Sequence, residues 1–175
     1  MKKLLLPVIF TFIIVIVFGQ KVKKVTGVIS AQANIMAYDR LIQYIHSGAG
    51  AGLQAYYNAK HKIKPLVDVT VSLFSTNKIL LVFADGTTTA PKDFVLTTFA
   101  GLAYSPVKNL EVSISAGPSF VNGGTYAGIK PCIGYYFLKK ELIKAHAALT
   151  HIFERDNVSK RNAGFISFGI ALKIF

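Results

Sequence analysis

Histidine is the side chain that most often binds zinc or transfers protons near neutral pH, and the chain carries four of them. A zinc site needs ligands that converge on one point. His146 and His151 are separated by an odd number of positions, which on a β-strand places them on opposite faces. His46 and His61 fall on opposite sides of a membrane in the strand arrangement described below. The spacing therefore predicts no metal site, and no cofactor is expected.

Ionisable and amide side chains of both charge signs recur within otherwise apolar segments. A general acid or base acts on an oriented nucleophile or substrate, and no oriented nucleophile accompanies Glu111 or His146. We therefore expect no enzymatic activity, and we predict that these groups pair with one another and with water inside a barrel too narrow for a pore. The predicted interior set is Gln54, Asp68, Glu111, Lys130, Lys144 and His146.

Residues 48–52 alternate glycine with alanine and could be mistaken for a phosphate-binding loop. Such a loop connects a strand to a helix, and neither a preceding strand nor a following helix frames this segment. Small residues that allow close packing of strands are the preferred interpretation.

Alternation of apolar and polar residues is the main feature of the chain, and it predicts β-strands. In the last segment, Ile166, Phe168 and Ile170 share one face while Ser167 and Gly169 share the other. Eight such segments of about ten to thirteen residues have nearly the length that crosses a bilayer at a tilt. The first and the fourth alternate less cleanly. The predicted strands are residues 25–38, 48–59, 65–74, 93–104, 109–120, 125–137, 142–153 and 163–175.

The connections between these segments predict a barrel with two different ends. A membrane barrel with both termini in the periplasm has short turns on that side and longer loops outside. Every connection predicted to be periplasmic is short, and three of the four outer ones are long. The fourth, residues 121–124, contains the Asn-Gly-Gly sequence of a tight hairpin. The short connections are residues 60–64, 105–108 and 138–141, and the long ones are residues 39–47, 75–92 and 154–162.

Aromatic residues lie at the ends of the predicted strands, in phase with the apolar face. Membrane barrels place such rings at the two membrane interfaces, facing lipid. We therefore predict two aromatic girdles. Their members are Tyr57, Tyr104 and Phe137 at the periplasmic ends, and Phe94, Phe120 and Phe153 at the outer ends.

Pro118 and Pro131 fall inside predicted strands of a closed barrel, where every backbone N–H should have a partner. Proline has no N–H to donate. The two residues therefore indicate a bulge or a local break in the fifth and sixth strands, or an error in the predicted boundaries.

The N-terminus has the pattern of an export signal. Two lysines precede the apolar residues 4–18, and the small Gly19 follows them. The apolar stretch is shorter than the roughly 20 residues that span a bilayer, which favours cleavage over an uncleaved anchor helix. We predict a signal peptide over residues 1–19 and one barrel domain over residues 20–175.

The composition also points to a membrane barrel. The mean hydropathy is +0.45, yet no apolar run after the signal is long enough for a membrane helix. The single Cys132 cannot form a disulfide within the chain. High apolar content that is interrupted at every second residue is what strands with one lipid-facing side require.

The chain is strongly basic, with a formal net charge of +12. For an exported protein, anionic lipid headgroups and lipopolysaccharide phosphates are better partners than nucleic acid. Lysines gather in the connections predicted to be periplasmic, either as a solvated surface or as a ring that contacts inner-leaflet headgroups. This predicted rim consists of Lys60, Lys62, Lys64, Lys108, Lys139 and Lys140.

Together, the export signal, the eight alternating strands, the short turns and the terminal Phe175 resemble the small outer-membrane β-barrel proteins that include the OmpA membrane domain and OmpX. The resemblance covers the mature chain and is one of pattern. It implies a monomer in the outer membrane, inserted by the barrel-insertion machinery that reads a C-terminal aromatic residue. The alternation ending at Ile174 is one residue out of phase with that signal.

A second resemblance concerns His151, which is predicted to face lipid near the outer membrane surface. Lipid A deacylases are eight-stranded barrels with a His-x-Ser pattern at a similar place, but here the serine position is Phe153. The sequence thus predicts an all-β chain, an eight-stranded antiparallel up-and-down transmembrane barrel, with a structural or surface-interaction role. The alternatives are a lipid A-modifying hydrolase and a soluble secreted barrel that binds lipid.

Overall fold

The computed structural model describes residues 25–39, 45–57, 62–76, 81–82, 88–89, 92–137, 142–153 and 162–174. The predicted signal peptide lies outside these ranges, as does Phe175. Within the described ranges there is no helix of the length and hydropathy needed to span a bilayer.

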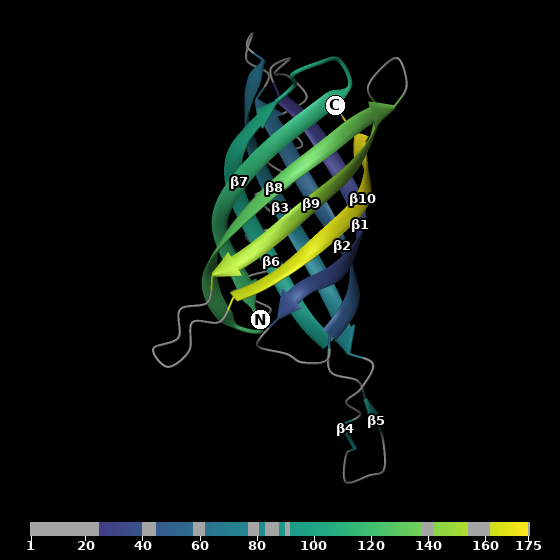
Figure 1. Ribbon diagram of the computed structural model, residues 1–175, viewed down its shortest axis with the longest axis vertical. Coiled ribbons are helices and arrows are strands. Elements are labelled where there is room, and N and C mark those ends of the chain that lie inside the picture. The colour runs from purple at the N-terminus through teal and green to yellow at the C-terminus, as the bar shows by residue number, and fades with distance from the viewer. Residues whose placement is uncertain are drawn as a thin grey trace.

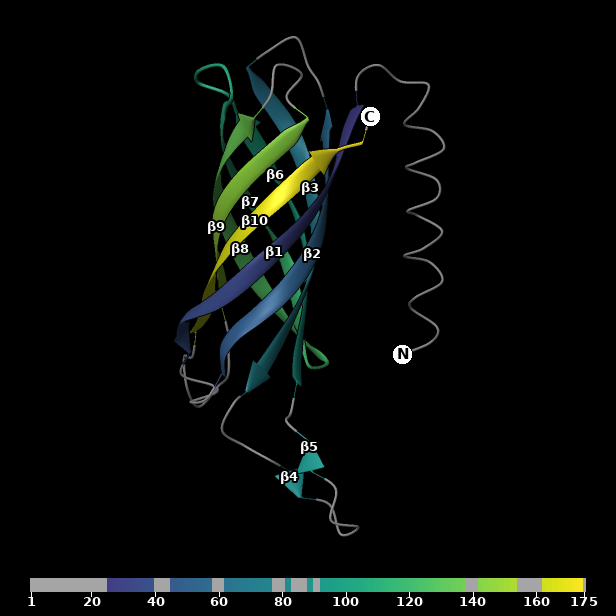
Figure 2. The same cartoon turned by 90° about the vertical axis from the view of Figure 1, so that its right-hand side faces the viewer.

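Eight long strands form one closed antiparallel barrel (Figures 1 and 2). Each pairs with the long strands before and after it in the chain, and β1 closes the ring by pairing with β10. All eight predicted segments overlap an observed strand, which confirms the up-and-down barrel. The strands are β1 (Val25–Asp39), β2 (Ile45–Tyr57), β3 (Ile63–Thr76), β6 (Lys92–Tyr104), β7 (Leu110–Val121), β8 (Gly124–Phe137), β9 (Ile143–Phe153) and β10 (Asn162–Lys173).

The connection from β3 to β6 carries a small sheet of its own. β4 (Leu81–Val82) and β5 (Thr88–Thr89) pair with each other and stay separate from the barrel. In Figure 2 they lie well beyond its end. The sequence predicts only a loop here, because strands of two residues are too short to show alternation.

The two ends of the barrel are named here by their connections. The short-turn end carries Val25, Lys173 and the turn of residues 105–109 between β6 and β7. The long-loop end carries β4 and β5 and the tight turn at Asn122 and Gly123. These two residues have φ values of 47° and 93°, and positive φ at both central residues is what a type I′ hairpin turn requires.

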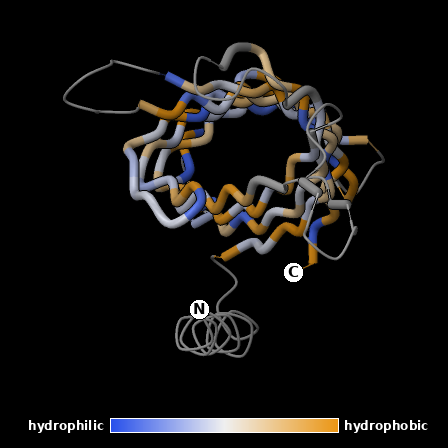
Figure 3. The backbone as a smooth tube through the Cα atoms, turned by 90° about the horizontal axis from the view of Figure 1, so that it is seen from below, coloured by the Kyte–Doolittle hydropathy of each residue, from blue (hydrophilic) through white to orange (hydrophobic). Residues whose placement is uncertain are grey.

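The barrel has apolar side chains on its outer surface and polar side chains inside, the reverse of a protein that folds in water. On β10, Ile170 is 65% exposed on the outer surface, whereas Ser167 faces inward and is 0% exposed. Viewed along the barrel, hydrophilic and hydrophobic residues alternate along the wall (Figure 3). Large apolar residues are exposed on every barrel strand, as lipid contact requires.

Two prolines interrupt the hydrogen-bonded ladders on either side of the β7–β8 hairpin. The β6–β7 ladder lacks two successive pairs at residues 117–118, beside Pro118. The β8–β9 ladder lacks two at residues 130–131, beside Pro131. Both ladders resume in the same register, so each proline causes a local break and no bulge. The missing N–H of proline accounts for both breaks.

Candidate functional site

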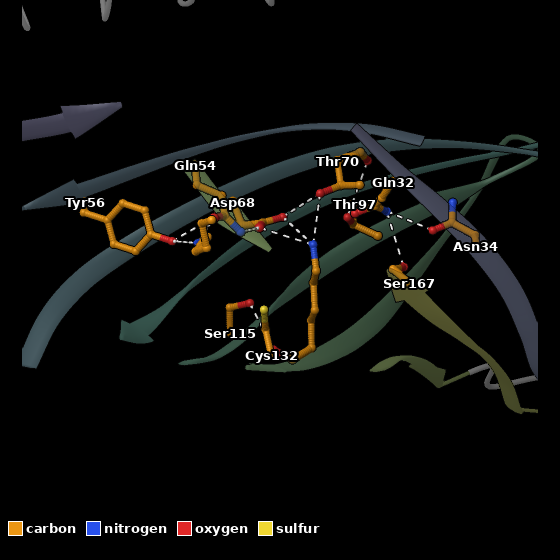
Figure 4. A network of polar contacts seen from close by, with 12 residues as sticks. Gln32, Asn34, Gln54, Tyr56, Asp68, Thr70, Thr97, Ser115, Cys132 and Ser167 are labelled. Carbon is orange, nitrogen blue, oxygen red and sulfur yellow. Dashed lines mark hydrogen bonds and ion pairs between the residues drawn. The ribbon is translucent and has the colours of Figure 1, made fainter. Parts of the chain in front are cut away.

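The interior of the barrel contains a lysine–carboxylate pair between β8 and β3 (Figure 4). Lys130 Nζ lies 3.1 Å from Asp68 Oδ1 and 3.2 Å from Asp68 Oδ2. Gln54 Nε2 and the Thr70 hydroxyl donate to the same carboxylate at 2.5 Å and 2.7 Å. Lys130 also donates to Thr70 Oγ1 at 3.1 Å. Asp68 and Lys130 are 1% and 3% exposed, so the pair is shielded from water.

A second pair joins β9 to β7. Lys144 Nζ donates to Glu111 Oε1 at 3.0 Å, and also contacts Gln54 Oε1 at 2.9 Å and the Tyr56 hydroxyl at 2.7 Å. The Tyr136 hydroxyl donates to Glu111 Oε2 at 3.0 Å. The ammonium also lies 5.2 Å from the centre of the Tyr56 ring, within cation–π range. Lys144 and Glu111 therefore each have other polar partners in addition to one another.

Gln54 connects the two pairs, because its amide nitrogen donates to Asp68 and its oxygen accepts from Lys144. One network therefore joins β2, β3, β7, β8 and β9 across the interior. Paired, multiply hydrogen-bonded charges of this kind fix the arrangement of a low-dielectric interior. Five of the six predicted interior residues belong to this network.

His146 is the sixth predicted residue, and it stands apart from the network. It is buried, but its Nδ1 has no hydrogen-bond partner among the described residues. Its ring occupies the space beside Gly169, where a Cβ would lie only 2.6 Å from His146 Cε1. Across the described ranges, no group of three or more His, Cys, Asp or Glu side chains is placed to hold a metal ion.

Apolar residues cluster towards both ends of the interior, a feature that the alternation pattern does not predict. Along the inward face of β3, Leu66 is followed by Asp68, Thr70 and Ser72, and then by Phe74. Phe74 stacks edge-on against Phe165, with ring centroids 5.1 Å apart. One apolar cluster comprises Val28, Tyr56, Leu66, Ala103 and Ala171, and the other, nearer the long-loop end, comprises Phe74, Val95, Ile152 and Phe165.

These inward apolar residues explain why the fourth predicted strand alternated poorly. On β6, Val95 and Phe99 face the interior, while Thr98 lies on the outward face. At these positions, apolar residues therefore lie on the interior face of this strand and a polar residue lies on its outward face, the opposite of the expected alternation. One sequence signal could have identified these inward apolar residues. Several neighbouring strands each carry an apolar residue at a position where the alternation predicts a polar one, and these positions lie at the same height in the barrel.

The six residues predicted to form aromatic girdles all lie exposed on the outer surface. Tyr57, Tyr104 and Phe137 are the last residues of β2, β6 and β8, at the short-turn end. Phe94, Phe120 and Phe153 lie near the long-loop end. The rings therefore form two bands, as membrane interfaces would require. Exposed aliphatic side chains such as Ile114 and Ile170 lie between the bands and form an outer belt.

The predicted lysine rim is described only in part. Lys60, Lys139 and Lys140 lie outside the described residues. Lys62 and Lys108 are exposed at the short-turn end. Lys64 is half-buried on the inward-facing side of β3, the side that also carries Leu66 and Asp68, so it faces the mouth of the barrel rather than the surrounding membrane.

His151 lies on the outer surface of β9, where its ring contacts Phe153 edge-on at 4.2 Å between centroids. A deacylase-like site would need a hydroxyl nucleophile beside it. The residues paired with His151 across the two ladders are Gly164 and Ile129, and neither carries a hydroxyl. The geometry gives the hydrolase alternative no support and groups His151 with the outer aromatic residues.

No family model matches the chain, and neither does any curated protein. Solved structures do. Ail, the attachment invasion locus protein of Yersinia pestis, superposes with a TM-score of 0.56 at 9% identity, over 87% of this chain and 100% of Ail. Neisserial surface protein A gives 0.54 at 15% identity, over 85% and 97%. The N-terminal β-barrel domain of Pseudomonas aeruginosa OprF gives 0.55 at 14% identity, over 85% and 97%. At these identities, the likeness is one of fold.

Proposed function

We propose that this chain is an outer-membrane β-barrel protein without enzymatic activity, whose long-loop end contacts surfaces outside the cell. One observation carries the proposal: large apolar side chains cover the outside of a closed barrel, while four deeply buried charges inside it form two ion pairs. In water, such an exposed belt would cause association. In a bilayer, it matches the hydrocarbon core, and the two aromatic bands match the interfaces.

The immediate partners in this proposal are outer-membrane lipids, with lipopolysaccharide around the long-loop half. Insertion requires the barrel-insertion machinery. The closed ring leaves no unpaired barrel edge on which another copy could add a strand, which favours a monomer. In this proposal, the segment between β3 and β6 that carries β4 and β5 is the part that meets an external partner.

Fractionation of cells that express the tagged protein tests the proposal directly. We expect the protein in the outer-membrane fraction, migrating faster in a detergent gel when unboiled than when boiled, because a closed barrel resists detergent unfolding. A soluble band whose mobility boiling does not change would contradict the proposal. That outcome would favour the alternative of a secreted lipid-binding barrel.

Orientation can be tested in the same cells with single cysteines in a Cys132→Ser background. Asn162→Cys lies at the long-loop end and Val107→Cys at the short-turn end, and both positions are exposed. A membrane-impermeant maleimide added to intact cells should label Asn162→Cys and reach Val107→Cys only after the outer membrane is permeabilised. The reverse pattern would show that the barrel is inverted.

The hydrolase alternative makes a separate prediction. Overexpression would change the acylation of lipid A, and His151→Ala would abolish the change. We expect unchanged lipid A in both strains by mass spectrometry. A shift in lipid A mass that depends on His151 would overturn the non-enzymatic proposal while leaving the barrel intact.

A further inference from the structure

The short-turn end of the barrel contains a basin of about 140 Å³, bounded on its interior side by three members of the network described above. Glu111, Tyr56 and Tyr136 line it from the interior side, and Lys64 and Lys173 line it from the wall. Lys108 lines it from the turn of residues 105–109. Three lysines from three separate elements therefore line one small space.

Among the described residues, the lysines that line the basin lack a carboxylate partner. Among the described lysines, only Lys130 and Lys144 form ion pairs with carboxylates. Glu111 is the one carboxylate in the basin lining, and its oxygens already accept from Lys144 and Tyr136. The charges of Lys64, Lys108 and Lys173 therefore have no carboxylate counter-charge among the described residues.

The wall holds these lysines in place. Lys173 donates its backbone N–H to Leu142 O at 2.9 Å, and the next residue, Ile174, donates to Gly27 O at 2.8 Å. The turn that carries Lys108 is tied to the start of β3, because Ser105 N–H donates to Lys62 O at 3.3 Å. The backbone of the basin is therefore fixed before any ligand arrives, which lowers the entropic cost of binding.

We infer that this basin binds a phosphate monoester group. A monoester carries close to two negative charges near neutral pH, so it balances three lysines better than a single carboxylate would. Since a water molecule takes about 30 Å³ of liquid volume, the basin has room for one phosphate and a few waters. Lysine ammonium groups bind phosphate as point charges and need no planar geometry.

The inference is independent of the role proposed for the long loops and requires only the folded barrel. The phosphate can belong to a soluble ester or to a lipid headgroup that bends into the mouth of the barrel. These two sources share their chemistry, and a lipid-composition experiment separates them.

The test is a phosphorus NMR titration of glycerol 3-phosphate with the mature protein refolded in an amine-oxide detergent that contains no phosphorus, at about pH 8, where the ester is a dianion. Wild type should broaden and shift the resonance in a saturable way. The double variant Lys64→Gln and Lys173→Gln should raise the Kd about tenfold or more, since it removes two charged contacts.

Lys62→Gln is the matched control, because Lys62 precedes Lys64 by two positions and does not line the basin. It should leave the Kd within about twofold. Equal losses in the control and the double variant would overturn the site, because they would show only general attraction to a basic surface. A wild-type protein without saturable binding would overturn it as well. If the double variant does not fold by the boiling test, Lys108→Gln, on the turn, replaces it and should raise the Kd about threefold, since it removes one charged contact.

Nanodiscs then identify the source of the phosphate. Discs of phosphatidylcholine alone should permit glycerol 3-phosphate binding in either case. If added phosphatidic acid abolishes that binding, the lipid headgroup occupies the basin. If binding persists, a soluble ester is the ligand. The boiling test, applied to the same sample, shows whether the barrel is folded, so failure of the basin and failure of the barrel are distinguished.

Discussion

Replacing Asp68 with alanine is expected to lower the free energy of unfolding by about 3–5 kcal/mol, the cost of leaving a buried charge without its partner. Lys130 would keep only its contact with Thr70 Oγ1, and Gln54 would lose an acceptor. Urea titration of the protein in lipid vesicles, with the folded fraction measured by gel mobility, provides the measurement.

The double variant Asp68→Leu and Lys130→Met distinguishes the effect of the ion pair from the effect of the volume that its side chains occupy. Because apolar residues of similar volume often replace a buried ion pair without loss, this variant should recover most of the stability. Ser72→Ala is the matched control on the same inward face of β3. Its hydroxyl is buried and has no hydrogen-bond partner in the part of the chain that the structure describes, so its removal should change stability by less than about 1 kcal/mol. A small effect of Asp68→Ala would contradict the network described here.

A lysine introduced in the middle of the outer belt should lower the free energy of unfolding almost as much as Asp68→Ala does. Ile114 on β7 is 53% exposed and lies between the aromatic bands. In a bilayer, Ile114→Lys should cost about 2–4 kcal/mol, because the ammonium must leave water or distort the lipid. The same urea titration measures it.

Val107→Lys is the control, since Val107 is 61% exposed but belongs to the turn outside the belt. It should change stability by less than about 0.5 kcal/mol, as a surface substitution does. Equal and small effects at both positions would mean that Ile114 faces water. That result would contradict the membrane assignment and favour the alternative of a soluble barrel.

The barrel was predictable from the sequence because strand faces repeat every second residue and the repeat is local. Residues 163–175 show it clearly, since Ile166, Phe168 and Ile170 all face outward as predicted. Residues 93–104 show it poorly, because Val95 and Phe99 belong to the interior. The alternation rule assigns an apolar residue to lipid, and it cannot identify an apolar residue that fills the end of a barrel.

The pairing of charges was less predictable than their location. The sequence predicts that Asp68, Glu111, Lys130 and Lys144 share an interior, but either lysine could pair with either carboxylate. The choice depends on the relative heights of strands that are not neighbours, which the closure of the ring sets. The orientation of Lys64 was also not predictable. The sequence predicts that it lies on the lysine rim, whereas in the structure it faces the mouth of the barrel.

The wall of the barrel is not equally strong around its circumference. Where β1 meets β10, the chain ends are joined by a ladder that is continuous from Val28 to Met36. The seams on either side of the β7–β8 hairpin each lack two pairs, at Pro118 and Pro131. We therefore expect partial opening by heat to begin around this hairpin and not where β1 meets β10. In detergent, amide hydrogens beside the two prolines should exchange with solvent sooner than those of β1. The β7–β8 hairpin would then open locally while the rest of the barrel stays closed.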